Sequence, residues 1–280
     1  MVLNSCRLQK LLPLLILQLF IFKAFSNDPF PIGARSWGMG NAVVAMPHEQ
    51  SFFYNPAGLA YTESTHAFAS YHSRFDIPGL GNAGVGAVIK TKAVNFGVGF
   101  EQFGDELYNE VKGGIAFSRQ QGRVSLGLKI SYLQAAVQDL TAKSTILSEF
   151  GVMADIRDNF RIGFHAYNLT GAKLFASQNI PTVLRLGFSY QPSEQISLNA
   201  EAEKSTFYKL NIKAGIEYEI RKSFFVRSGI NSLTNTFHFG TGMRLRNLQF
   251  DYAVNTSNIL GLSHHLTVGT ALKRKGGKRG

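Results

Sequence analysis

The feature that most constrains this chain is a series of short segments between residues 66 and 272 in which apolar and polar residues alternate. In residues 92–103, for example, Phe96, Val98 and Phe100 alternate with an asparagine and two glycines. A β-strand has a side-chain period of two, so each segment predicts a strand with one apolar face and one small or polar face. We distinguish fourteen such segments: 66–73, 81–90, 92–103, 106–118, 122–134, 144–157, 159–168, 183–191, 194–204, 209–220, 222–231, 236–245, 247–254 and 263–272.

The connections between these segments alternate in length. Short polar joints, such as those at Asp158 and Arg221, are followed by longer loops, such as residues 169–182. Short turns at one end, longer loops at the other and an even strand number are typical of bacterial outer-membrane barrels. A closed barrel pairs its backbone groups internally and can cross lipid without an apolar helix. We therefore predict an all-β fold, a single transmembrane antiparallel β-barrel of about fourteen strands over residues 66–272.

The polar faces carry most of the charges. A basic residue that faces lipid at the bilayer midplane costs roughly 2–4 kcal/mol, so we expect these faces to line the lumen, where opposite charges pair. His165 is expected inside as well. The alternative is a secreted soluble β-sandwich or barrel with its apolar faces inward. The predicted lumen charges are Lys129, Arg161, Arg185, Glu201, Glu203, Lys213, Glu217, Arg227, Arg244 and Asp251.

The first 26 residues have the pattern of a signal peptide. Arg7 and Lys10 precede an apolar run over residues 11–22, and Ala24 and Ser26 are small residues at the positions that a signal peptidase reads. The run is too short to span a bilayer as a helix, which favours cleavage over an uncleaved anchor. Export followed by barrel formation predicts the outer membrane of a Gram-negative bacterium as the location.

The charge of +11 is concentrated at the two ends of the chain. Without the three basic residues of the signal and the five of residues 273–280, the body carries only about +3. No basic face or nucleic-acid motif is recognisable, so nucleic-acid binding is not expected. The basic tail is expected to be a disordered, solvated end, or else a contact for acidic headgroups, peptidoglycan-side partners or a protein. The only cysteine, Cys6, lies in the signal, which excludes disulfides and thiolate sites from the mature chain.

Residues 27–65 do not alternate and contain two motifs. The glycines around Met39 follow no predicted strand, so they do not indicate a dinucleotide site. Glycine here is expected to permit tight turns and close packing, and the second motif has the residue types of a turn. The motif residues are Gly33, Ala34, Arg35, Gly38, Met39, Gly40 and Ala42, followed by Asn55, Pro56, Ala57, Gly58, Leu59 and Ala60.

This pair of motifs resembles the N-terminal signature of the FadL-like outer-membrane superfamily, especially its PorV/PorQ branch. The resemblance implies a fourteen-stranded barrel with an N-terminal plug, residues 27–65, folded into the lumen. It also implies that the Asn55–Leu59 turn helps to hold that plug. The branch includes outer-membrane components of the type IX secretion system, which attach to the translocon and hand over secreted cargo.

The sequence contains no recognisable catalytic or metal-binding signature. It lacks Gly-x-Ser-x-Gly, His-Glu-x-x-His and an acidic calcium loop. His264 and His265 would point to opposite faces of a strand, so they do not form a chelating pair. We expect no enzyme activity, cofactor or metal. The lumen charges could line a polar channel, or they could pair with one another and with plug residues such as Arg35.

Three functional hypotheses remain at this point. The first is a non-enzymatic PorV/PorQ-type barrel that contacts secretion-system or other outer-membrane proteins in protein transport or surface assembly. The second is a FadL-like transporter of a hydrophobic small molecule, and the third is a structural barrel in outer-membrane lipid. The short outer loops and basic tail favour the first. An apolar pocket between plug and wall would instead favour the second.

Overall fold

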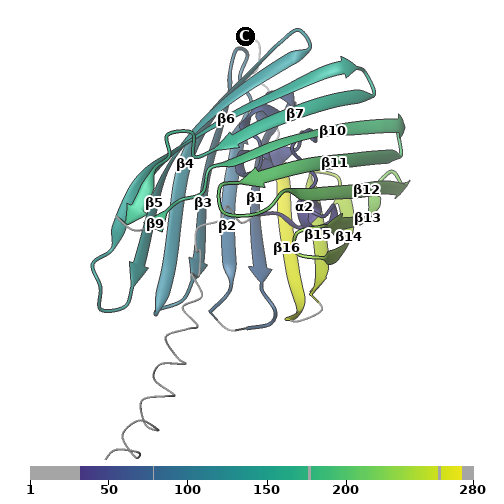
Figure 1. Cartoon of the computed structure of the whole chain (residues 1–280). Helices are drawn as coiled ribbons and strands as arrows, with labels where there is room; N and C mark the ends of the chain where they lie inside the picture. The colour runs from purple at the N-terminus through teal and green to yellow at the C-terminus, as the bar shows by residue number, and fades with distance from the viewer. Residues whose placement is uncertain (1–31, 78, 176–177, 258–259, 273–280) are drawn as a thin grey trace, which may run out of the picture.

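The computed structural model describes residues 32–77, 79–175, 178–257 and 260–272. The predicted signal peptide, residues 27–31 of the predicted plug and the basic tail lie outside the described residues. Fourteen strands form one closed antiparallel barrel, in which each strand pairs with the next one of the barrel and β16 pairs with β1 (Figure 1). The fold class predicted from the alternating segments is confirmed.

The strand boundaries follow the predicted segments within a few residues. The barrel strands are β1 Thr65–Ser73, β2 Asn82–Ile89, β3 Asn95–Gly104, β4 Tyr108–Gln121, β5 Val124–Val137, β6 Lys143–Arg157, β7 Phe160–Tyr167, β10 Val183–Ser193, β11 Ile196–Ser205, β12 Asn211–Arg221, β13 Phe224–Asn231, β14 Thr236–Leu245, β15 Leu248–Ser257 and β16 Gly261–Leu272. Two further short strands, β8 Lys173–Phe175 and β9 Gln178–Asn179, pair with each other between β7 and β10 and were not predicted.

The two ends of the barrel differ. At the end that we call the turn end, strands are joined by short turns at residues 90–94, 122–123, 158–159, 194–195, 222–223 and 246–247. At the opposite end, the loop end, the connections are mostly longer, and the longest runs over residues 168–182. The loop end lies towards the bottom of Figure 1.

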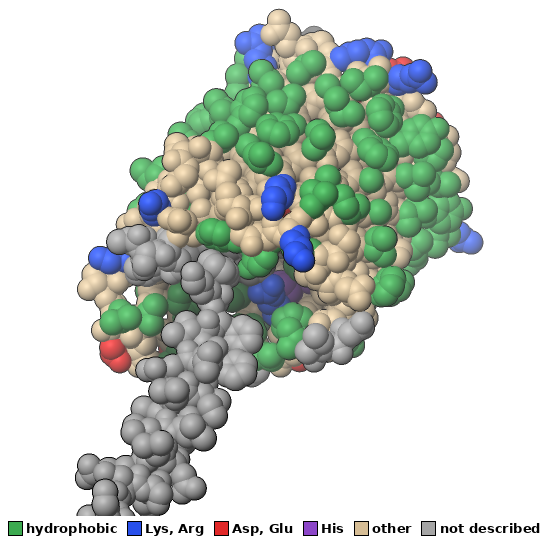
Figure 2. All heavy atoms as spheres, viewed as in Figure 1, with side chains coloured by type: hydrophobic (Ala, Val, Ile, Leu, Met, Phe, Trp, Pro, Cys, Tyr) green, Lys and Arg blue, Asp and Glu red, His purple; other side chains and the backbone are tan. Residues whose placement is uncertain are grey.

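The barrel is polar inside and apolar outside. In β5, the outward Leu128 and Ile130 are 57% and 53% exposed, whereas Lys129 between them is 2% exposed. Figure 2 shows the resulting field of hydrophobic side chains on the outer face. The soluble alternative, with its apolar faces inward, is therefore wrong, because an exposed apolar band of this kind needs lipid to cover it. Within the described ranges, no helix is long and apolar enough to cross a membrane.

Residues 32–64, which we call the N-terminal segment, lie inside the ring of strands (Figure 1). The segment contains the α-helix α2 Ala34–Gly38 and two 3₁₀ helices, η1 Glu49–Phe53 and η2 Pro56–Tyr61. α2 packs against β13–β16, whereas η1 packs against β1–β3 and η2 against β3–β6. The segment thus contacts opposite sides of the wall and crosses the barrel interior.

Inner-face glycines let the backbone of the N-terminal segment touch the wall. A Cβ added at Gly215 of β12 would overlap the backbone of Met39, and one at Gly229 of β13 would overlap the following peptide. The same holds for other parts of the segment at Gly127 and Gly163. The close contact therefore depends on the absence of side chains at these positions.

Candidate functional site

The first motif places an arginine in the barrel interior. Gly33 and Gly40 have φ values of 124° and 64°, which L-residues with side chains rarely adopt, and they flank the turn of α2. Arg35 from this turn donates from Nε and Nη2 to the two carboxylate oxygens of Glu217, at 2.9 and 2.7 Å. Burial by itself would lower the pKa of Arg35, but the carboxylate outweighs it and holds that pKa above its ordinary value.

Glu217 belongs to a longer chain of charges. Its Oε2 also accepts from Arg227 Nε at 2.5 Å, and Arg227 Nη1 donates to Asp251 Oδ1 at 2.7 Å. Two guanidinium groups and two carboxylates thus alternate, and the cluster is formally neutral. A neutral, fully bonded cluster can remain buried, whereas a single unpaired charge cannot.

A second cluster joins the N-terminal segment to β10–β12. Glu201 Oε2 accepts from the backbone N–H groups of Val43 and Val44 at 3.0 and 2.9 Å. Lys213 Nζ donates to Glu201 Oε1 at 3.0 Å, and Arg185 Nε donates to Glu203 Oε2 at 2.6 Å. Glu201 therefore holds the backbone of the segment while its own charge is balanced by the wall.

A third cluster lies on β5, β6 and β7. Glu149 pairs with Lys129 at 3.0 Å and with His165 Nε2 at 3.1 Å, and all three side chains are buried. Lys129 Nζ lies 4.4 Å from the centre of the Phe52 ring, a cation–π contact with the segment. The inner charges are thus largely paired with one another, which does not favour an open polar channel.

The second motif anchors the segment by hydrogen bonds. Asn55 Nδ2 donates to the carbonyl oxygens of Val44, Val152 and Phe164, at 2.7, 3.3 and 3.2 Å. Its Oδ1 accepts from the backbone N–H of Ala57 at 3.1 Å and so caps η2. One buried side chain therefore connects two turns of the segment to two strands.

The remaining predicted site residues have simpler positions. Ala34, Met39, Ala42, Pro56, Ala57, Gly58, Leu59 and Ala60 are buried between segment and wall, as is Gly38 beside Gly240. Arg161 is half-buried against Asp155 and Tyr61. Arg244 lies on the inner face, opposite Gln249, but at the rim of the turn end, where it is exposed over the Phe225 ring. It is only two residues from the turn at 246–247, beyond the depth that the segment fills.

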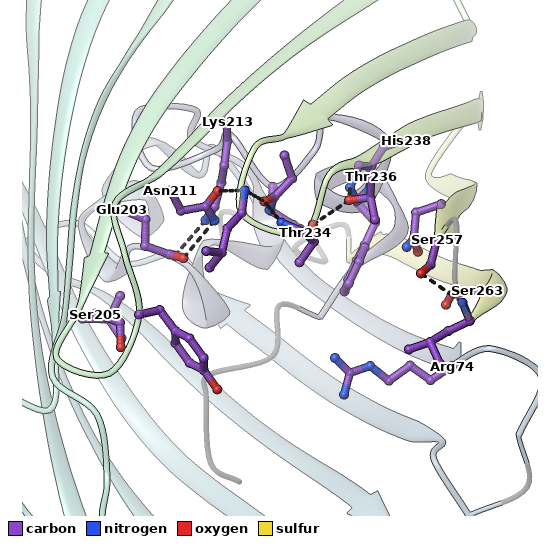
Figure 3. A pocket seen from close by; sticks show the side chains of 18 of the residues that line it. Arg74, Glu203, Ser205, Asn211, Lys213, Thr234, Thr236, His238, Ser257 and Ser263 are labelled. Atoms are coloured by element: carbon purple, nitrogen blue, oxygen red, sulfur yellow. Dashed lines mark hydrogen bonds and ion pairs between the residues drawn. The ribbon is translucent and has the colours of Figure 1, made fainter. Parts of the chain in front are cut away.

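A pocket of about 360 Å³ opens at the loop end between the N-terminal segment and the inner faces of β10–β16. Figure 3 shows Glu203, Asn211 and Lys213 on one side of it and Arg74, Ser257 and Ser263 on another. Apolar side chains, among them Trp37, Val183, Leu233 and Leu260, share the lining with hydroxyls, amides and paired charges. The pocket therefore offers apolar contact area together with a few groups that fix orientation, as small-molecule sites do.

Aromatic rings form part of the pocket floor. Trp37, the single tryptophan of the chain, stacks on His265 at a centroid distance of 3.9 Å, and His265 stacks on His72 at 3.7 Å. His238 lies 5.7 Å from Trp37 and lines the pocket with it. Within the described residues, no group of three or more His, Cys, Asp or Glu is arranged to hold a metal ion.

The sequence analysis did not single out several residues of this interior, among them Glu149 and Trp37. Glu149 was missed because its inner-face neighbours on β6, Leu147, Gly151 and Met153, are small or apolar and gave no polar pattern. Trp37 was missed because it occupies an unspecified position of the first motif. The signal that could have identified Trp37 is a large aromatic residue among the glycines of a turn, because such a residue is usually buried.

Comparison with known proteins supports the fold. No protein-family model and no curated protein matches the chain. Among solved structures, the CymD monoaromatic hydrocarbon channel is similar with a TM-score of 0.68 at 13% identity, covering 90% of this chain and 100% of that one. The P. putida toluene transporter TodX has a TM-score of 0.67 at 11% identity, covering 88% and 100%. At such identities the likeness shows a common barrel fold.

Proposed function

We propose that this chain is a non-enzymatic outer-membrane barrel that binds a small, largely hydrophobic molecule in the loop-end pocket and transports it across the outer membrane. The observation that carries the proposal is the position of the pocket between the N-terminal segment and the wall, with Trp37 and Leu233 in its lining. A pocket in this position favours the transporter hypothesis over the secretion-partner hypothesis. The similar structures, named as a hydrocarbon channel and a toluene transporter, support the same choice.

In this proposal the N-terminal segment acts as the plug. Its helices reach opposite sides of the wall, and the clusters of Glu201 and Glu217 fasten it there. The loop end would face outward and the turn end the periplasm, as in other bacterial barrels. A ligand that enters from outside would therefore reach the loop-end pocket and contact the N-terminal segment there.

Trp37 provides the test, because no other residue contributes tryptophan fluorescence. The purified chain in detergent is titrated with iodobenzene, whose heavy atom quenches an indole in contact with it. We expect saturable quenching that toluene competes away. A linear, non-saturable response that toluene leaves unchanged contradicts the proposal.

A pair of variants makes the test specific to the pocket. Leu233→Asp places a charge in the lining, whereas Leu140→Asp makes the same change at an exposed loop residue outside the lining. Losing roughly 1.4 kcal/mol of apolar contact weakens binding about tenfold, which is the effect expected for Leu233→Asp. Leu140→Asp should bind as the wild type does, and equal weakening in both variants would exclude this pocket.

A second function is favoured by one observation at the loop end. Leu107, Leu140, Leu169 and Leu210 are exposed there by 64%, 69%, 51% and 57%, outside the pocket lining. Apolar residues at an exposed rim suit a protein contact, which agrees with the PorV/PorQ-like resemblance of the motifs. Stoichiometric recovery of a secretion-system or surface-assembly protein with the tagged chain from native outer membranes would support this function. Recovery of the chain alone would count against it.

A further inference from the structure

The turn end repeats one arrangement around the barrel: an outward aliphatic side chain followed or preceded by a basic residue. Ile89 is followed by Lys90, Ile156 by Arg157 and Ile220 by Arg221, and all of these side chains are exposed. Three different turns thus show the same order. Two more turns contribute the pairs Val124 with Arg123 and Leu245 with Arg246.

The aliphatic members of the pairs fix the depth of the basic ones. Ile89, Ile156 and Ile220 are 44%, 52% and 45% exposed and continue the apolar outer face of their strands. That face is the part of the barrel that lipid tails cover. A basic residue next to its last aliphatic side chain therefore lies where the tails end and the headgroups begin, and its long side chain can extend to them.

Exposed charges are distributed unequally between the two ends. Among the described residues of the turn end, the exposed basic side chains outnumber the exposed acidic ones, Glu63, Asp158 and Glu194. The basic set at this end is Lys90, Lys92, Arg119, Arg123, Arg157, Arg221, Lys222 and Arg246, while the exposed Arg244 is left out because it lies on the inner face over the Phe225 ring. At the loop end, exposed charges balance: Lys143, Lys173, Lys204 and Lys209 against Asp76, Asp105, Glu106 and Asp139.

Figure 2 shows the result on one face, with Lys and Arg side chains at the upper edge above the hydrophobic field. Within the described part of the chain, the basic set forms one ion pair on the outer surface, between Arg123 and Asp158, at 3.0 Å between side chains that are 61% and 94% exposed. An exposed pair of this kind is weak. The remaining excess of positive charge is therefore available for an external anion.

We propose that this basic turn ring binds the anionic headgroups of phospholipids in the leaflet at the turn end. Charge complementarity selects an anion, and the adjoining aliphatic side chains select one that is attached to acyl chains. A ring around the barrel, instead of a patch on one side, fits the lipid annulus better than a single docked protein. The interaction fixes the depth of the barrel and gives the turn-end leaflet a local preference for acidic lipid.

The experiment compares the lipids that remain with the protein. The full chain is reconstituted into vesicles of phosphatidylcholine with a minor fraction of phosphatidylglycerol, extracted with a disc-forming polymer, and its lipids are quantified by mass spectrometry. We expect phosphatidylglycerol to be enriched over its bulk fraction, and the enrichment to fall at high salt because exposed charges are screened. An annulus with the bulk composition overturns the proposal.

Two triple variants with the same charge change locate the effect. Lys90→Gln, Arg157→Gln and Arg221→Gln together should abolish the enrichment. The matched control, Lys143→Gln, Lys173→Gln and Lys204→Gln, alters the loop end and should keep it. All six side chains are exposed, so both variants are expected to fold, which retarded migration of the unheated barrel in a gel checks. Equal loss in both variants, or no loss in the first, overturns the proposal.

Discussion

Arg35 of the N-terminal segment and Glu217 of β12 form a two-point ion pair across the barrel interior, although 182 positions separate them in the chain. Glu217 is shared with Arg227, which in turn bonds to Asp251. The segment is therefore held by a carboxylate of the wall that is also bonded to a second arginine of the wall. This relationship makes the attachment of the segment testable by single substitutions.

Arg35→Met should destabilise the folded barrel by about 3 kcal/mol, because it leaves a buried carboxylate with one cation fewer. The measurement is the urea midpoint of unfolding in detergent. Arg119→Met, at an exposed outward position, should change it little. A double variant, Arg35→Met with Glu217→Met, should lose less than the two single changes summed, and strict additivity would show that the pair does not interact.

Gly215→Ala tests the close contact between segment and wall. The new methyl group would overlap the Met39 backbone, so we expect a loss of about 1–3 kcal/mol and faster proteolysis of the segment. Gly113→Ala is the matched control on β4, because a Cβ there meets nothing nearer than 3.7 Å. Equal effects of the two substitutions would mean that the segment does not rest on the glycine surface.

Asn55→Ala removes the side chain that joins two turns of the segment to the wall. Three carbonyl oxygens lose a donor and the Ala57 N–H loses its acceptor, which should cost about 1–3 kcal/mol. Hydrogen exchange of the peptide around Ala57 should accelerate. Asn55→Asp keeps the acceptor but not the donors, so it should protect the Ala57 amide while still weakening the attachment. Unchanged exchange in Asn55→Ala would contradict the assigned role.

His48 predicts a pH dependence of the segment. Burial, assisted by the charge of Arg35, lowers the pKa of this imidazole from 6.5 to about 3, and its neutral Nδ1 accepts from the Gln50 N–H. In the unfolded chain His48 therefore takes up a proton near pH 6.5, whereas in the folded chain it stays neutral until the pH approaches about 3. Stability from this group is complete above that pH and is lost as the pH falls towards about 3. His48→Asn, an acceptor that does not titrate, should flatten this part of the curve, and an unchanged slope would assign it to other groups.

The strand pattern was predictable because lipid and lumen impose opposite demands on alternate residues. Leu128, Lys129 and Ile130 of β5 show this directly, and the same alternation located all fourteen barrel strands. The β8–β9 hairpin was not predicted, because strands of three and two residues are too short to show a period. The sequence thus predicts the membrane-spanning strands more completely than it predicts the short strands of a loop.

The pocket could not be predicted in the same way. Its lining comes from seven strands, several loops and Trp37, so it exists only where the N-terminal segment rests on the wall. Motif resemblance identified the segment but not the space above it. The position of the pocket therefore favours the small-molecule hypothesis, whereas the sequence by itself favours the secretion-partner hypothesis.

The most direct test of the central proposal is a structure of the chain in lipid after exposure to iodobenzene, with the iodine located by its anomalous scattering. The account predicts iodine in the loop-end pocket, between Trp37 and Leu233, and its disappearance when toluene is present in excess. Iodine found only on the outer surface of the barrel, or at no defined position while the pocket stays unoccupied, would contradict it.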